Sequence, residues 1–279
     1  MLFGNLFATF GAAPGLALSL LSALYFIASF CVYASLIYQI SRRIRDASGI
    51  DEPARAFGLP EAILASVLIF FFLLTISSTV PDPALQFHPR NLLANFLLSA
   101  FVVLVIATLL QFRGFDVAAL AGFLRISFFR TLGTGAILLF FAYPLIGFSE
   151  GINQRFFGGG SSKQSIVEFF SASGTIKERI MIIVFAVAIA PVVEEFVFRF
   201  FIYGVLKRYV GCLLGVILSS LLFAAAHAHL PSFVPLFVLG SCFAIAYEWS
   251  DSILVSMTMH SLFNSLTLIA LAFPEITSQ

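Results

Sequence analysis

Three apolar stretches of membrane-spanning length in the second half of the sequence carry chemically distinctive residues four positions apart. The three sets are Glu194 and Glu195 with Arg199, Phe223 with His227, and His260 with Asn264. A charged side chain at the centre of a bilayer costs about 3 kcal/mol on insertion scales, so such groups usually face one another or a water-filled cavity. Together these residues supply two carboxylates, a guanidinium, two imidazoles and a carboxamide. Cleavage of a bond inside a membrane would need groups of this kind.

The first set divides its two carboxylates between different faces of a helix. Glu195 and Arg199 stand at i and i+4 and can pair, whereas Glu194 points about 100° away from Glu195. An ion pair that only fixes helix packing would account for Glu195 and Arg199. It would not account for Glu194, which would then be an unpaired acid in an apolar helix. Glu194 is therefore the candidate general base.

Either histidine alone would be weak evidence for a functional site, but the two histidines together are stronger evidence. One histidine on an apolar helix is more often a hydrogen-bonded packing residue than a functional one. Two such helices, carrying His227 and His260 beside a helix with two glutamates, favour a site. Glu248, next to Trp249 and Asp251, is instead expected at a helix end, at the level of the lipid headgroups.

Composition places these residues in an all-α, polytopic membrane protein. Hydrophobic residues make up 60% of the 279 residues, charged residues only 10%, and the mean hydropathy is +1.04. Soluble domains have about 25% charged residues. The net charge of +1 gives no reason to expect nucleic acid as a partner. The lipid bilayer is the expected environment.

Stretches of about 20 apolar residues predict about eight transmembrane helices. Their expected ranges are 16–40, 61–80, 91–111, 131–149, 180–205, 211–230, 232–249 and 252–273. The first stretch is longer than the core of a signal peptide and is interpreted as a retained anchor. The loops on one side hold nine basic residues: Arg42, Arg43, Arg45, Arg55, Arg113, Arg125, Arg130, Lys207 and Arg208. The other side holds five, so we expect both termini outside the cytoplasm.

The distribution of polar residues suggests three regions. Residues 1–149 are expected to form a four-helix membrane scaffold that could also admit substrate laterally or bind a partner. Residues 150–179, with Gly158 to Ser162, are expected to be a flexible extracytoplasmic loop. Residues 180–279 hold the three sets and form the expected catalytic core.

The three sets, in their order and spacing, resemble the motifs of the CAAX protease and bacteriocin-processing family of intramembrane endopeptidases. The segments are Ala190-Pro191-Val192-Val193-Glu194-Glu195-Phe196-Val197-Phe198-Arg199, then Phe223-x-x-x-His227, then His260-x-x-x-Asn264. The resemblance covers roughly residues 180–270. Phe200 departs from it, because the family commonly has glycine at that position. The first half of the chain matches nothing in the family and is where specificity could reside.

The resemblance implies an all-helical fold with a water-filled cavity and peptide-bond hydrolysis, in the manner of a glutamic protease. Glu194 would activate water, and His227 would hold that water or the glutamate. His260 and Asn264 would donate to the oxyanion, Arg199 would hold Glu195, and Phe223 would line the cavity. The substrate would be a membrane-anchored or lipidated protein or peptide. The expected location is the cytoplasmic membrane of a bacterium or archaeon.

The expected helix limits create one difficulty for this site. At 1.5 Å per residue, His260 would lie about 12 Å from the cytoplasmic end of its helix, Glu194 about 17 Å and His227 about 24 Å. Convergence of the three side chains would then require helix tilt or a later start of the sixth helix.

A metal and two other functions remain as alternatives. Two histidines and a glutamate are the ligands of some zinc peptidases. However, no His-Glu-x-x-His segment is present, and a glutamate that binds zinc could not also serve freely as base. We therefore expect no required cofactor, with a zinc-dependent metalloprotease as the alternative. A non-catalytic immunity or scaffold protein could retain the same residues, and a proton-coupled transporter could use glutamate and histidine as a relay.

Overall fold

The computed structural model describes residues 15–47, 57–78, 89–157 and 176–273, and within them the ordered elements are all helical. The first half contains α2 (Leu16–Ala47), α3 (Leu59–Ser78), α5 (Pro89–Phe112), the short α6 (Val117–Leu120) and α7 (Phe128–Phe157). The second half begins with α9 (Ile176–Val184), η2 (Phe185–Ile189), α10 (Ala190–Glu195), η3 (Phe196–Ile202) and α11 (Tyr203–Ala226). It ends with η4 (Leu230–Ser232), α12 (Phe233–Ser250) and α13 (Ile253–Ala272). The predicted all-α fold is confirmed.

Six helical segments of the described residues are long and apolar enough to cross a membrane. The longest, Ile176–Ala226, has 51 residues, which is too long for a single straight helix that crosses a membrane once. At Gly211 the backbone adopts φ 84° and ψ 170°, a conformation that only glycine reaches without strain. The chain reverses there, and Gly215 packs back against the Lys207 backbone. Together with the shorter apolar helix Leu59–Leu74, these segments fit the predicted polytopic membrane protein.

The position of this turn resolves the expected difference in height between Glu194 and His227. The helix does not stop at residue 205 but continues to the turn, so Glu194 lies 16 residues before Val210. His227 lies 16 residues after Gly211 and caps the end of α11. The two helical segments on either side of the turn are antiparallel and equal in length, so Glu194 and His227 lie at the same depth. The sequence-based limit at residue 205 was wrong by about one turn of helix.

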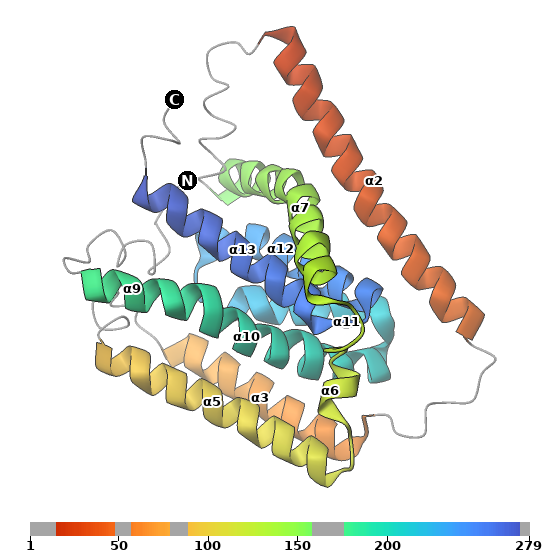
Figure 1. Cartoon of the computed structure of the whole chain (residues 1–279), viewed down its shortest axis with the longest axis vertical. Helices are drawn as coiled ribbons and strands as arrows, with labels where there is room; N and C mark the ends of the chain where they lie inside the picture. The colour runs from red at the N-terminus through yellow and green to blue at the C-terminus, as the bar shows by residue number, and fades with distance from the viewer. Residues whose placement is uncertain (1–14, 48–56, 79–88, 158–175, 274–279) are drawn as a thin grey trace.

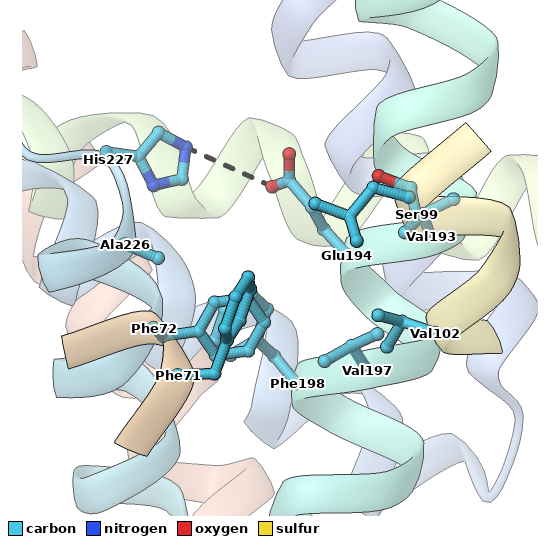
Figure 2. Close-up of a pocket in the computed structure, with 11 residues that line it drawn as sticks. Phe71, Phe72, Ser99, Val102, Val193, Glu194, Val197, Phe198, Ala226 and His227 are labelled. Carbon is cyan, nitrogen blue, oxygen red and sulfur yellow. Dashed lines mark ion pairs between the residues drawn. The ribbon is translucent and has the colours of Figure 1, made fainter. Parts of the chain in front are cut away.

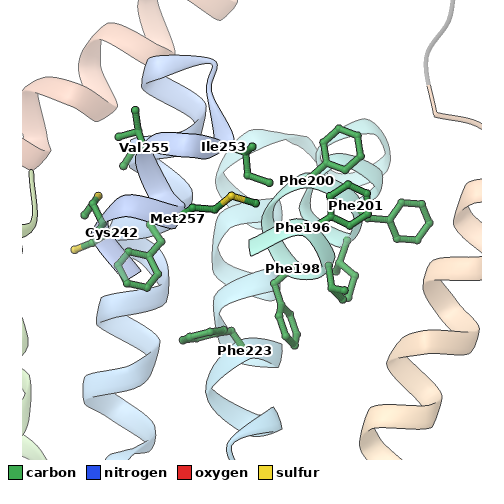
Figure 3. Close-up of a cluster of buried hydrophobic side chains, with 14 of the residues drawn as sticks. Phe196, Phe198, Phe200, Phe201, Phe223, Cys242, Ile253, Val255 and Met257 are labelled. Carbon is green, nitrogen blue, oxygen red and sulfur yellow. The ribbon is translucent and has the colours of Figure 1, made fainter. Parts of the chain in front are cut away.

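The helices of the second half form the centre of the molecule, and the first half covers them on two sides. In Figure 1, α3 and α5 lie together on one side of α10 and α11, while α2 lies on the opposite side and packs on α7 and α12. Tyr33 of α2 donates a hydrogen bond to the Leu138 carbonyl of α7 at 2.9 Å. Figure 3 shows the buried aromatic cluster at the centre, where side chains of η3 meet Phe223 of α11 and Met257 of α13.

Three of the basic residues expected on one side gather at one end. Arg43 contacts Asp251, Arg125 lies near the same carboxylate, and Lys207 contacts Glu248. This end, the basic end, carries the turn at Gly211. The scaffold helices also hold a buried charge that the sequence did not lead us to expect: Glu61 of α3 is fully buried and pairs with Arg113 at 3.1 Å.

Helices extend into both ends of the loop that was predicted at residues 150–179. Helix α7 continues to Phe157 and α9 begins at Ile176, so both ends of that range are helical. The glycine- and serine-rich run from Gly158 to Ser162 lies outside the described residues. The three-region division therefore stays a prediction.

Candidate active site

A proline shapes the segment that carries the two glutamates. Pro191 has no backbone N–H, so the regular helical bonding pattern cannot continue through it. The chain widens into the π-helical turn η2, in which the Ala190 N–H bonds to the Phe185 carbonyl. The Ala186 carbonyl is then without a helical donor, because its π-helical partner would be Pro191. The Asn264 amide Nδ2 fills this position, donating to the Ala186 carbonyl at 2.8 Å.

Glu194 and the two histidines meet at one point between α10, α11 and α13. Glu194 Oε2 lies 3.9 Å from Nε2 of His227 and 3.8 Å from Nε2 of His260. The Glu194 side chain is 28% exposed and that of His227 is 27% exposed, whereas His260 is buried. Both Nε2 atoms therefore face a single carboxylate group that is within reach of solvent.

Glu195 belongs to a separate, fully buried ion pair. Its Oε1 lies 3.2 Å from Arg199 Nη1, one helical turn away, as the spacing predicted. Arg199 also donates to the Gly240 carbonyl of α12 at 3.3 Å. A Cβ at Gly240 would lie 3.1 Å from Arg199 Nη2, so a glycine keeps α12 close to the guanidinium. The Arg199 guanidinium carbon stands 4.0 Å from the centre of the Phe223 ring, in the geometry of a cation–π contact.

Each histidine is oriented through its Nδ1 atom. His260 Nδ1 lies 2.9 Å from Glu195 Oε1, and His227 Nδ1 lies 2.8 Å from the Phe223 carbonyl. A carbonyl oxygen can only accept, so His227 carries its proton on Nδ1. Its Nε2 is then an acceptor in the neutral ring. The Phe243 ring stacks on His260 with centroids 5.0 Å apart and fixes the plane of that imidazole.

A cavity of about 240 Å³ opens beside Glu194 and His227. Figure 2 shows the two polar side chains at one end and a cluster of apolar side chains at the other. Helices of the first half contribute five of its residues: Phe71, Phe72, Leu98, Ser99 and Val102. The others come from α10, η3 and the end of α11: Val193, Glu194, Val197, Phe198, Ala226 and His227. The scaffold helices α3 and α5 thus form one wall of the candidate site.

Three of the four predicted catalytic side chains converge, and the supporting residues differ in part from expectation. Asn264 lies one turn after His260 and bonds to the Ala186 carbonyl. Phe223 was expected to line the cavity. It is instead fully buried behind it, between the Arg199 guanidinium and the two imidazole rings. Phe200, where the family commonly has glycine, is buried against Phe57 and Phe196.

The distances between the possible donor atoms can be compared with the distances between the ligands of a zinc ion. Ligands 2.0–2.1 Å from a tetrahedral metal lie about 3.4 Å from one another. The Glu194 oxygen is 3.8–3.9 Å from the two Nε2 atoms. Among the described residues, no three His, Cys, Asp or Glu side chains form a group that could hold a metal.

The sequence did not predict that α3 and α5 would line the cavity, or that the Gly240 carbonyl would accept a hydrogen bond from Arg199. Phe72 and Val102 look like ordinary lipid-facing residues in their apolar helices, and nothing in their spacing distinguishes them. The Gly240 carbonyl carries no sequence signal either, because it is a backbone group. A small residue in the middle of α12, opposite the arginine helix, was the one available hint.

The fold and the site define a polytopic membrane protein with a buried acid–base cluster open to an apolar cavity. Residues 176–266 match the family model "Type II CAAX prenyl endopeptidase Rce1-like". The chain is also 36% identical, over 102 residues, to the membrane-embedded CAAX protease MroQ of Staphylococcus aureus. That alignment covers 34% of this chain and 41% of the relative, so it spans less than half of each protein. No solved structure matches the chain.

Residues 176–266 are therefore similar to the type II CAAX prenyl endopeptidase family that the motifs resemble. The matched segment contains Glu194, Glu195, Arg199, His227 and His260, and also Asn264. Helices α3 and α5, which form the cavity wall, lie outside it. The apolar helices make this an integral membrane protein, and the relative is bacterial, in agreement with a bacterial membrane.

Proposed function

We propose that the chain is an intramembrane endopeptidase that hydrolyses a peptide bond of a membrane-associated or lipidated protein, with water activated by Glu194. One observation carries the proposal. A single Glu194 oxygen lies 3.9 Å and 3.8 Å from the Nε2 atoms of two oriented histidines, at the end of an apolar cavity. A carboxylate that has no lysine or arginine partner among the described residues, placed among fixed imidazoles, fits acid–base chemistry better than packing.

Each residue has a distinct role in this reaction. A water molecule beside Glu194 gives one proton to the carboxylate, and its second hydrogen bonds to the free Nε2 of His227. The water oxygen attacks the carbonyl carbon and forms a tetrahedral intermediate with a negative oxygen. Glu194 then donates its proton to the leaving nitrogen, and the C–N bond breaks. The products are a carboxylic acid and an amine, so atoms and charge balance.

His260 is assigned to the negative oxygen of the intermediate. Glu194 and Glu195 supply two negative charges in this region, and Arg199 supplies one positive charge. We assign His260 to donate through both nitrogens during the reaction, from Nδ1 to Glu195 and from Nε2 toward the substrate. Asn264 is assigned a positioning role, because its amide nitrogen already holds the Ala186 carbonyl.

The function is tested by comparing membrane peptides from cells that produce the wild-type chain or the Glu194→Gln variant. Peptides that depend on the wild-type chain should be absent with the variant. A scaffold or immunity protein would give the same peptides in both samples. A proton-coupled transporter would change substrate uptake without changing the peptides.

The cavity makes a prediction about substrate choice. Replacing Val102 by Phe on α5 places a ring in the 240 Å³ space next to Glu194. Cleavage beside bulky apolar residues should fall about tenfold relative to cleavage beside small ones, because steric exclusion of a few methylene groups costs about 1–3 kcal/mol. The residues flanking the cleavage sites in the membrane peptides measure this. Leu104→Phe, on the exposed face of the same helix, is the matched control. An unchanged distribution with Val102→Phe would remove the cavity from substrate recognition.

We also propose that hydrolysis needs no tightly bound metal, because Glu194 acts as the base and the three donors are spaced more widely than zinc ligands. Purified protein should contain much less than one zinc ion per chain by elemental mass spectrometry, and prolonged chelation should leave activity intact. A stoichiometric metal that disappears in a His227→Ala variant, with activity restored by adding the metal back, would establish the metalloprotease alternative.

A further inference from the structure

A second cavity of about 200 Å³ lies at the basic end and shares no lining residue with the first. Its lining mixes charged and aromatic side chains with a few small or apolar ones. The residues are Phe57, Leu120, Arg125, Phe200, Tyr203, Gly204, Lys207, Tyr247, Glu248 and Asp251. Neither the three sets of residues four positions apart nor the proposed reaction uses this cavity.

Among the described residues, the four charged residues that line the cavity, taken together with Arg43 beside it, leave one positive charge in excess. Glu248 lies 2.6 Å from Lys207, and Asp251 lies 2.6 Å from Arg43, so each carboxylate has its own close cation. Arg125 is only 3.7 Å from Asp251, which Arg43 already neutralises. The Arg125 side chain is 61% exposed. The group that would complete this arrangement is a single negative charge beside Arg125.

The chain next to Arg125 is strongly apolar and exposed. Leu124 is 95% exposed, Phe128 73% and Phe129 82%. Large exposed apolar side chains in a membrane protein face lipid, whereas an exposed arginine reaches the headgroup level. Arg125 is therefore placed at the membrane surface rather than in bulk water. A ligand with both a negative headgroup and acyl chains matches these surroundings better than a soluble anion does.

We propose that this cavity binds the headgroup phosphate of an anionic phospholipid. Arg125 is the main donor to the phosphate oxygens, and Lys207 faces the same space while it remains paired with Glu248. The acyl chains lie along the apolar side chains that flank Arg125. Basic cavities between helices at the cytoplasmic face are known sites for anionic headgroups, and the basic end is the face expected in the cytoplasm. The inference does not depend on the proposed protease activity.

Tryptophan fluorescence tests this site directly. Trp249 is the single tryptophan of the chain and follows Glu248. The full chain in a nonionic detergent is titrated with phosphatidylglycerol or phosphatidylcholine whose acyl chains carry bromine, which quenches nearby tryptophan. We expect saturable quenching at lower concentration with phosphatidylglycerol. Arg125→Gln should weaken its apparent affinity about fivefold, since one basic residue near an anionic headgroup contributes about that much.

The matched control is Arg130→Gln, which removes an exposed arginine from the same end without touching the cavity lining. Its affinity for phosphatidylglycerol should equal that of the wild type. Equal affinity of the wild type for the two lipids, or equal loss in both arginine variants, would overturn the proposal. Sodium phosphate at matched concentration should not relieve the quenching. If it did, the site would take free phosphate and not a lipid.

Discussion

Replacing Glu194 with glutamine should abolish peptide-bond hydrolysis while the protein remains folded in the membrane. Glutamine has the same shape but cannot take a proton from water, and loss of a general base typically costs about 10²–10⁴-fold in rate. The side chain is 28% exposed and, among the described residues, forms no ion pair with a lysine or arginine, so the fold does not depend on its charge. Turnover of a peptide identified from the membrane comparison measures the effect, with gel filtration in detergent as the measure of folding.

Two further variants make this experiment specific. Glu150→Gln, at a glutamate that accepts a hydrogen bond from Gln154 on α7, should retain full activity. Glu194→Asp keeps the charge but draws it back by one methylene, and should show partial activity because its distance to both Nε2 atoms changes. Wild-type turnover in Glu194→Gln would refute the assignment of Glu194 as the base.

The sequence predicts the helices and the ion pair because both depend on local spacing. Long apolar runs can only be helices in a bilayer, where every backbone group must be bonded within its own segment. Glu195 and Arg199, four residues apart, meet at 3.2 Å for the same reason. The convergence of Glu194 with His227 and His260 follows from the motifs, whereas the limits assigned to the helices argued against it.

Those limits failed because a hairpin inside one apolar run leaves little trace in composition. Lys207 and Arg208 suggested that the helix ends near residue 205, yet lysine side chains can extend along a helix end to reach a polar partner. Lys207 does so by bonding to Glu248, and the turn comes only at Gly211. A glycine is the one residue that could adopt φ 84° there, but glycine is frequent in membrane helices and marks no turn by itself.

The roles of Asn264 and Phe223 could not be predicted because they depend on groups of other helices. Asn264 is explained by the carbonyl that Pro191 leaves without a donor, and Pro191 lies 73 residues away along the chain. The role of Phe223 is explained by the Arg199 guanidinium of the neighbouring helical segment, which stacks on the Phe223 ring. Residue type and spacing identify such residues as notable, and only the packing of helices shows what they contact.

Replacing Arg199 with alanine should have the largest effect on stability. Arg199 and Glu195 are both fully buried, and removal of one partner leaves the other charge uncompensated, at a cost of about 3–5 kcal/mol. The midpoint of unfolding in mixed detergent micelles measures this. Arg42→Ala is the control, because Arg42 forms an exposed pair with Asp46 whose loss should cost less than about 1 kcal/mol.

The double variant Glu195→Gln with Arg199→Met separates folding from chemistry. It removes both buried charges and keeps similar volumes, so much of the stability lost in Arg199→Ala should return. Activity should stay low, because the introduced glutamine could accept a hydrogen bond from His260 but would no longer place a negatively charged oxygen beside Nδ1 of that histidine. A double variant that was both stable and fully active would show that the buried pair serves packing alone, and that His260 needs no charged partner to act on the substrate.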